Sequence, residues 1–202
     1  MSNLYISDLH LCHENVIKFD NRPFKSLDEM HEIILQNWNN KVNDNDTVYI
    51  LGDFCMSKDK DDWIKFLSQM KGKKIIVKGN HDRIVNDGNI RKYLNGVYEF
   101  VEVKDSGFRL ILSHYPIIFH RGAYNPDIYM LYGHIHNTRE YDFIKKWRKE
   151  IKETHSNSGD ALGNFINVGC MMPYMAYTPR TISEIIGGDL LYNGWFKFFR
   201  CI

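Results

Sequence analysis

The chain has 202 residues, of which 44% are hydrophobic and 25% charged, a composition typical of a globular protein. These proportions exclude a disordered tail, a collagenous repeat and a coiled coil. Lys and Arg number 26 against 25 Asp and Glu, so the formal net charge of +1 argues against a strongly basic nucleic-acid binder, although a local basic patch stays open.

The predicted elements alternate between short apolar runs, typical of strands covered on both faces, and amphipathic helical patterns. Strands and helices in this order predict an α/β fold built as a layered sandwich. The first helix begins with a capping-box sequence, and the second with several aspartates, which favour a helix N-terminus. In chain order we expect a strand at Leu4–Ile6, a helix after Ser26, a strand at Val48–Leu51, a helix over 59–70, a strand at Ile75–Val77, a hairpin of 98–103 and Phe108–Leu112 with its turn at 105–107, a strand at Met130–Tyr132, a helix over 140–153 and a strand at Phe165–Val168.

No repeat or Pro/Gly-rich linker divides the chain, so we expect a single domain over residues 1–202. No apolar run approaches the roughly 18 residues of a membrane-spanning helix, and the first residues do not resemble a signal peptide. The cysteines at 12, 55, 170 and 201 are scattered without a C-x-x-C motif, which indicates reduced thiols. We therefore expect a cytoplasmic protein without a membrane partner. The aromatic run at 195–199 predicts an edge strand, or a dimer contact if it is exposed.

Side chains of metal-ligand type follow several of the predicted strands directly. Ligands of open α/β folds bind beyond the carboxyl ends of the strands, and carboxylates, imidazoles and carboxamides are all metal ligands. If these strand ends converge, they bring together more ligands than one metal needs. The residues are Asp8 and His10 after the first strand, Asp53 after the second, Asn80 with His81 and Asp82 after the third, His114 after the hairpin, and His134 with His136 after the next strand.

Glycines at 52, 79 and 133 each precede a candidate ligand, where a residue without Cβ allows a sharp turn and a close approach; ordinary turn glycines are the alternative. The carboxylate of Asp53 has two oxygens and is the natural bridge between two divalent cations about 3.5–4 Å apart. Mixed nitrogen and oxygen donors suit manganese or iron, with zinc, nickel or magnesium as alternatives, better than calcium. Such a pair predicts phosphoester hydrolysis by a metal-bridging hydroxide.

In their order along the chain, these motifs resemble the calcineurin-like metallophosphoesterase superfamily. The resemblance rests on Asp8-x-His10, Gly52-Asp53, Gly79-Asn80-His81-Asp82, His114 and Gly133-His134-x-His136. It implies a layered αββα sandwich with mixed sheets. It also implies one metal held by Asp8, His10, Asp53 and His136, and a second held by Asp53, Asn80, His114 and His134.

The same resemblance implies roles for two further residues. His81 would stabilise the transition-state phosphate or protonate the leaving oxygen. Asp82 would orient His81, or act as a helix N-cap. Phe54 follows Asp53 where protein phosphatases usually continue Asp-Arg-Gly, and Asp82 stands where they have Glu. The chain is therefore more similar to a small group of bacterial and phage phosphoesterases, also on account of the segments at 12–17 and 21–24.

Four further side chains are candidates for substrate contacts. His13 lines the phosphate pocket or is a solvated residue at a helix start. Arg22 clamps a phosphate with its planar guanidinium, or is a surface arginine. His120 and Arg121 lie in the segment 115–130, which links two ligand-bearing strands and should pass close to the metals.

The leading hypothesis is a di-metal hydrolase of phosphomonoesters or phosphodiesters, with a phosphorylated small molecule or nucleotide as substrate. One alternative is a nuclease acting on DNA or RNA, for which Arg22, Arg121 and Arg180 would form a local basic patch. The other is a non-catalytic scaffold that binds a protein partner. Substrate, native metal and oligomeric state stay open at this point.

Overall fold

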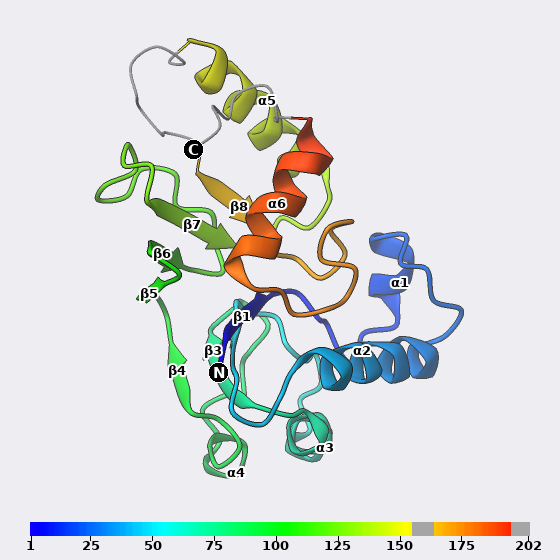
Figure 1. Cartoon of the computed structure of the whole chain (residues 1–202). Coiled ribbons are helices and arrows are strands. Elements are labelled where there is room, and N and C mark those ends of the chain that lie inside the picture. Colours follow the sequence, from blue (N-terminus) through cyan, green and yellow to red (C-terminus); the bar gives the residue numbers. More distant parts are fainter. Residues whose placement is uncertain (155–163, 195–202) are drawn as a thin grey trace.

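Two four-stranded sheets form the centre of the computed structural model, which describes residues 1–154 and 164–194 (Figure 1). The first sheet is parallel throughout, with strands β1 (Asn3–Ile6), β2 (Thr47–Ile50), β3 (Lys73–Val77) and β4 (Gly96–Tyr98) in that order. The second consists of β5 (Val101–Asp105), β6 (Phe108–Leu112), β7 (Ile128–Tyr132) and β8 (Phe165–Asn167). It is mixed, because β5 runs antiparallel to β6 while the other pairs are parallel.

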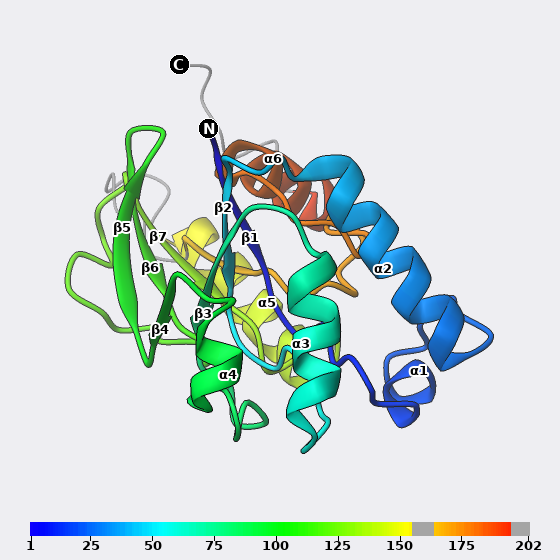
Figure 2. The same cartoon turned by 90° about the horizontal axis from the view of Figure 1, so that it is seen from below.

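Helices cover the outer faces of this pair of sheets (Figures 1 and 2). Apolar residues of two long helices share one core cluster with both sheets, and another helix covers the far face of the second sheet. The resulting α/β/β/α order confirms the layered sandwich. The helices are α1 (Asn15–Phe19), α2 (Leu27–Lys41) and α3 (Lys60–Gln69) on the side of the first sheet, α4 (Gly88–Arg91), α5 (Arg139–Thr154) on the second sheet, and α6 (Ile182–Asn193).

The second sheet shows why its strands are apolar at every position. Leu110 and Leu112 belong to the core between the sheets, whereas Ile111 and Met130 belong to the cluster that contains Ile144 of α5. Successive side chains of a strand point to opposite faces. A strand with an apolar partner layer on each face therefore reads as a continuous apolar run.

The hairpin predicted from residues 98–103 and 108–112 is half wrong. Gly96–Tyr98 pairs in parallel with β3 in the first sheet, and only Val101–Asp105 pairs with β6 in the second. The chain thus crosses from one sheet to the other within the expected strand. The predicted turn is correct: Ser106 and Gly107 have φ values of 52° and 87° between the paired ends of β5 and β6, as two-residue hairpin turns require.

Helix α6 was not expected from the sequence. It contacts both β1 and β8, so it spans the edges of the two sheets. Thr181 and Glu184 form a capping box at its start, while the pair Gly187-Gly188 in its middle weakens the helical signal. No helix in the described ranges is long and apolar enough to cross a membrane. The aromatic run at 195–199 lies outside the described residues.

Candidate metal centre

The loops that follow the ligand-bearing strands are tied to one another by their backbones. The Asp8 N–H donates to the Gly52 carbonyl (3.0 Å) and the His10 N–H to the Asp53 carbonyl (2.9 Å). The His134 N–H donates to the Asp8 carboxylate (3.1 Å), although the two residues are 126 positions apart and follow strands of different sheets. The carboxyl ends of both sheets therefore meet at one place, as the sequence predicted.

Two groups of side chains there have the composition and spacing to hold a metal ion. Within each group, one ligand atom of every residue lies within 4.8 Å of the others. Asp53 Oδ2 lies 3.5 Å from Nε2 of His10 and also 3.5 Å from Nε2 of His114. Asn80 Oδ1 lies 3.1 Å from the same nitrogen of His114. The structure thus brings six of the seven predicted ligands together in two adjoining groups, Asp8 with His10 and His136, and Asp53 with His114 and His134, and places Asn80 beside His114.

The atoms that face the centre of these groups suit a cation. His114 Nδ1 donates to the Leu51 carbonyl (2.8 Å), so Nε2 is directed at the oxygens of Asn80 and Asp53. Burial lowers the pKa of His114, but contact with Asp53 and the charge of Asp8 outweigh burial and raise the pKa to about 9. Conversely, burial raises the pKa of Asp53, and its hydrogen bond and charge interaction with His114 bring the pKa down to about 2. The site thus stabilises positive charge among oxygen and imidazole acceptors, which is what a divalent cation requires.

A carboxylate that the sequence analysis missed holds one of the histidines. Asp20 Oδ1 accepts a hydrogen bond from His136 Nδ1 (2.7 Å), which directs His136 Nε2 toward Asp8 and His10. Metal-binding histidines commonly have such a carboxylate partner on their second nitrogen. Asp20 is 116 residues from His136. In the sequence, Asp20 is simply an aspartate two residues before Arg22. Its contact with His136 can be recognised only in the folded chain.

Arg22 has a position that differs from both expectations for it. Its side chain has no exposed area. Nη1 donates to the Leu9 carbonyl (2.8 Å), Nη2 to the Asp8 carbonyl (2.9 Å), and both Nε and Nη2 to Asp20. The guanidinium therefore stabilises the Asp8 loop and Asp20 from inside the protein, and it neither clamps a substrate nor lies at the surface.

Asp82 likewise has a different role from the expected one. Its buried carboxylate accepts hydrogen bonds from the backbone N–H groups of Asp53 (2.9 Å), Phe54 (2.9 Å) and Gly79 (2.8 Å). It therefore joins the loops after β2 and β3 instead of orienting the His81 ring. It is not the helix N-cap either, because Asp87 caps α4.

The ligand loops combine strained backbone at the ligands with glycines at points of close approach. Asp8, His10, Asp53, His134 and His136 all have φ between 48° and 67°, a region that non-glycine residues adopt mainly where surrounding contacts enforce it. A Cβ on the glycine at 52 would overlap the His114 ring, and a Cβ on the glycine at 79 would overlap the Asp53 carboxyl group. These glycines therefore permit close approach and are not ordinary turn residues.

His13 and His81 lie beside the two groups. Their ring centroids are 5.5 Å and 5.7 Å from that of His10. The His81 N–H donates to Asp53 Oδ1 (2.9 Å), which ties this residue to the shared carboxylate. His13 Nδ1 is buried and has no hydrogen-bond partner among the described residues. Both imidazoles therefore lie next to the group of Asp8, His10 and His136.

His120 and Arg121 are not brought to these groups by the contacts of their segment. The Arg121 carbonyl accepts hydrogen bonds from Arg109 (3.0 Å), in β6, and from His120 Nδ1 (3.4 Å). Because β6 and β7 are parallel, the chain must return from the end of β6 to the beginning of β7. The first part of the segment lies by the ligands, where the Tyr115 ring contacts His134 with centroids 4.6 Å apart.

The layered sandwich and the paired Asp/His groups at its strand ends define a class of metal-dependent phosphoesterases. A family model of the calcineurin-like phosphoesterases matches residues 1–192, and the chain belongs to this family. It is 35% identical over 155 residues to the uncharacterized protein MJ1445 of Methanocaldococcus jannaschii, covering 75% of this chain and 80% of that protein. It is also similar to the crystal structure of the protein of unknown function AQ665 from Aquifex aeolicus, with a TM-score of 0.59 and 26% identity over 92% of this chain and 97% of that one.

Proposed function

We propose that this protein is a di-metal phosphoesterase that hydrolyses a phosphomonoester or phosphodiester of a small molecule or nucleotide. The observation that carries the proposal is the position of Asp53 Oδ2, 3.5 Å from His10 Nε2 and 3.5 Å from His114 Nε2. These histidines belong to different groups, so one carboxylate is shared between them. A shared carboxylate is the arrangement that holds two neighbouring cations in hydrolytic sites.

In this proposal, each cation has nitrogen and oxygen ligands from this chain. Manganese or iron suits such a mixed set, with zinc, nickel and magnesium as alternatives. When bound, the two cations supply Lewis acidity and lower the pKa of coordinated water toward neutrality. Asp8, His10, Asp53 and His136 would hold one cation, and Asp53, Asn80, His114 and His134 would hold the other.

The remaining residues act on the substrate or on the ligands. His81 donates a hydrogen bond or a proton to the phosphate or to the leaving oxygen, since its ring lies beside His10 and its backbone is fixed on Asp53. The His13 ring also lies beside His10 and binds the phosphate. Asp20 and Asp82 are positioning residues, because they bind a ligand ring and ligand backbones.

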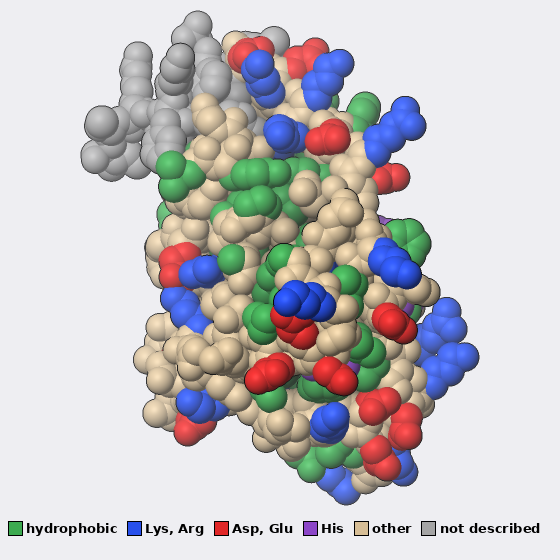
Figure 3. All heavy atoms as spheres, turned by 90° about the vertical axis from the view of Figure 1, so that its right-hand side faces the viewer, with side chains coloured by type: hydrophobic (Ala, Val, Ile, Leu, Met, Phe, Trp, Pro, Cys, Tyr) green, Lys and Arg blue, Asp and Glu red, His purple; other side chains and the backbone are tan. Residues whose placement is uncertain are grey.

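The distribution of charge favours a small substrate over a long nucleic acid. The net charge is +1, and on the face drawn in Figure 3 basic and acidic side chains are interspersed. Polymers of phosphodiesters bind mainly through many basic contacts along the backbone. Arg22, one of the arginines considered for such a patch, is buried behind the ligands.

The test is hydrolysis of bis-p-nitrophenyl phosphate and p-nitrophenyl phosphate by metal-stripped protein, with manganese, iron(II), nickel, zinc or magnesium added back. We expect metal-dependent cleavage that Asp53→Asn abolishes together with metal binding. Asp46→Asn is the matched control, because this buried carboxylate accepts hydrogen bonds from Ser2 and Asn43 instead of facing a ligand. His81→Ala should keep both metals and lose about 10²–10⁴-fold in turnover. Full activity of Asp53→Asn would refute the proposal, and full activity of His81→Ala would remove the role of that residue.

A further inference from the structure

A cavity adjoins the metal centre on the side of His136. It has a volume of about 590 Å³ and lies between the segment at 19–23 and the segment at 171–177. We call it the side cavity. Asp20 lines it and binds His136 Nδ1 (2.7 Å), and Asn137, the residue after His136, lines it as well. The hydrogen bond between Asp20 and His136 therefore links the lining of the cavity to the group of Asp8, His10 and His136.

The lining of the side cavity is suited to a neutral, flat group. None of the residues that line it is a lysine or an arginine, so it offers no partner for the charge of a phosphate. It presents apolar and aromatic surface from Phe19, Pro173 and Tyr177, together with the carboxamides of Asn21 and Asn137. The Phe19 side chain is 78% exposed. The volume of the side cavity is within the range of small-molecule sites, which typically combine apolar walls with a few polar groups.

The side cavity is also a built part of the fold. Asn21, Ala176 and Tyr177 have φ values of 49°, 46° and 54°, and all three line it. Backbone strain of this kind is retained at functional sites, where packing enforces it. The Arg22 guanidinium lies 5.7 Å from the centre of the Tyr177 ring and also binds the Asp8 carbonyl. The wall of the cavity and the loop that carries a predicted ligand therefore share one buried support.

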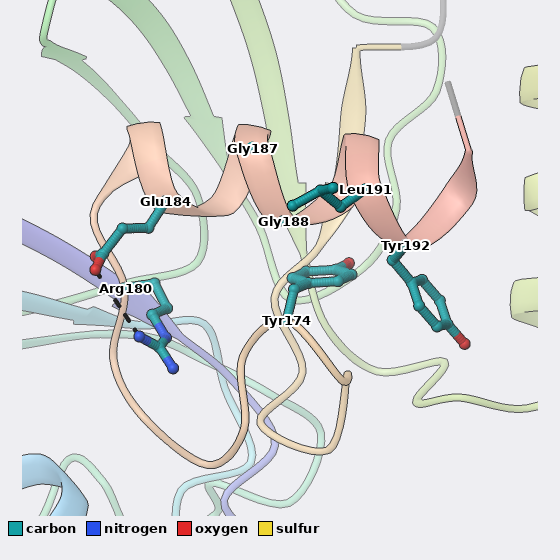
Figure 4. Close-up of a pocket in the computed structure, with 7 residues that line it drawn as sticks. All are labelled: Tyr174, Arg180, Glu184, Gly187, Gly188, Leu191 and Tyr192. Carbon is teal, nitrogen blue, oxygen red and sulfur yellow. Dashed lines mark ion pairs between the residues drawn. The ribbon is translucent and has the colours of Figure 1, made fainter. Parts of the chain in front are cut away.

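A cavity of similar size along α6 lacks these features. It has a volume of about 600 Å³, and Arg180 and Glu184, which line it, form an ion pair with each other (3.8 Å; Figure 4). Its lining includes none of the predicted metal ligands and neither Asp20 nor Asn137. It serves as an internal control for ligand binding.

We propose that the side cavity binds the nucleoside part of the substrate while the phosphate is held at the metal centre. This inference rests on the proposed function and names its substrate class as nucleoside phosphoesters. Phe19 stacks on the base, the carboxamides of Asn21 and Asn137 form hydrogen bonds with its edge, and the absence of lysine and arginine in the lining directs the charged phosphate to the cations. Each part of the substrate then meets a surface of matching chemistry.

The experiment measures binding of adenosine and uridine, with ribose as the negative probe, to the full chain saturated with Mn²⁺, by isothermal titration calorimetry. Wild type should bind at least one nucleoside and not ribose. Phe19→Ala should weaken that binding about tenfold, as expected for loss of one stacking contact, and Asn137→Ala should weaken it as well. Leu191→Ala, in the cavity along α6, should bind as wild type does.

Two results would overturn the inference: no binding of either nucleoside, or binding that Leu191→Ala weakens and Phe19→Ala does not. The same nucleoside should raise the KM for bis-p-nitrophenyl phosphate without lowering kcat. Because nucleoside binding needs no turnover, the two proposals fail separately. Hydrolysis without nucleoside binding refutes nucleoside binding by the side cavity and leaves the proposed phosphoesterase activity standing. Nucleoside binding without hydrolysis of any ester refutes the phosphoesterase activity and leaves the binding site standing.

Discussion

Replacing Asp20 by Asn tests whether this buried carboxylate acts on metal binding through His136. The carboxylate accepts hydrogen bonds from His136 Nδ1 (2.7 Å) and from the Arg22 guanidinium (2.9 and 3.0 Å). His136 binds Oδ1 and Arg22 binds Oδ2, and an amide has an oxygen at only one of these two positions. Whichever way the amide turns, one of them faces an NH₂ group in place of an oxygen. The substitution therefore releases either the histidine or the arginine.

The effect on metal binding should be confined to one group. Loss of a carboxylate partner of a ligating histidine typically weakens metal affinity or activity about 10–100-fold, which corresponds to about 1.4–2.7 kcal/mol. The group of Asp8, His10 and His136 should lose this affinity, because the substitution releases either His136 or the Arg22 guanidinium that binds the Asp8 carbonyl. The group of Asp53, His114 and His134 should change less than about threefold, since none of these residues is a hydrogen-bond partner of Asp20. Leaving a buried hydrogen-bonding group unsatisfied costs about 1–3 kcal/mol, which a domain with about 5–15 kcal/mol of stability withstands.

The assay is titration of metal-stripped protein with Mn²⁺ in competition with a chelator, alongside thermal unfolding. Asp46→Asn is the matched control, because Asp46 is also buried, at 5% exposed, and is bonded to Ser2 and Asn43. Equal weakening of both groups, or equal weakening in Asp46→Asn, would show that general destabilisation explains the effect. Unchanged affinity would refute the role of Asp20.

Three further predictions concern other parts of the fold. Asp189→Ala should lower the free energy of unfolding by about 3–5 kcal/mol in urea titrations, because it removes the carboxylate that binds the buried guanidinium of Arg148 (2.9 and 3.0 Å); a loss below about 1 kcal/mol would contradict this. Gly79→Ala should abolish metal binding, since the added methyl overlaps a ligand carboxylate, whereas Gly88→Ala, with no atom within 4 Å, should keep the metals and change stability by less than about 1 kcal/mol. The backbone N–H of Asn43 holds the pKa of Asp46 below its usual value despite burial. A depressed folded-state pKa gives stability that is present above the unfolded pKa of about 3.9 and is lost as pH falls below it. The stability difference between wild type and Asp46→Asn should therefore shrink when unfolding is measured below about pH 4, and a constant difference would refute the reasoning.

Much of the candidate centre is predictable from the sequence because its signals are local. Asp53 follows the apolar run of β2 directly, and His114 follows that of β6. The direction of the strands then places each side chain at the carboxyl edge of its own sheet. The partners of these ligands are different, since Asp20 and His136 are 116 residues apart. Nothing in the local pattern indicates which distant ring a carboxylate will contact.

The two wrong expectations about charged residues have the same physical origin. Arg22 reads as a surface or substrate residue because arginines are rarely buried, yet it satisfies the carbonyls of Asp8 and Leu9 inside the protein. Asp82 follows His81 in the sequence, but its carboxylate joins backbones of the β2 and β3 loops. In both cases the position of the side chain is set by backbone groups of neighbouring loops that need hydrogen-bond partners. These groups come together only in the folded chain.

The buried charges around the centre are explained by the strain of the ligand loops. Residues such as Asp8 and Asp53 with φ above 50° cost on the order of 1–3 kcal/mol each and persist only where surrounding contacts hold them. Arg22 binds the carbonyl of Asp8, and Asp82 accepts from the N–H of Asp53, so each buried charge fixes the backbone of one strained ligand. An apolar replacement could fill the same space but could not satisfy these backbone groups. Burial of Arg22 and Asp82 is therefore a requirement of the ligand geometry, and the cost of desolvating them is offset because the carbonyl and N–H groups would otherwise be unpaired.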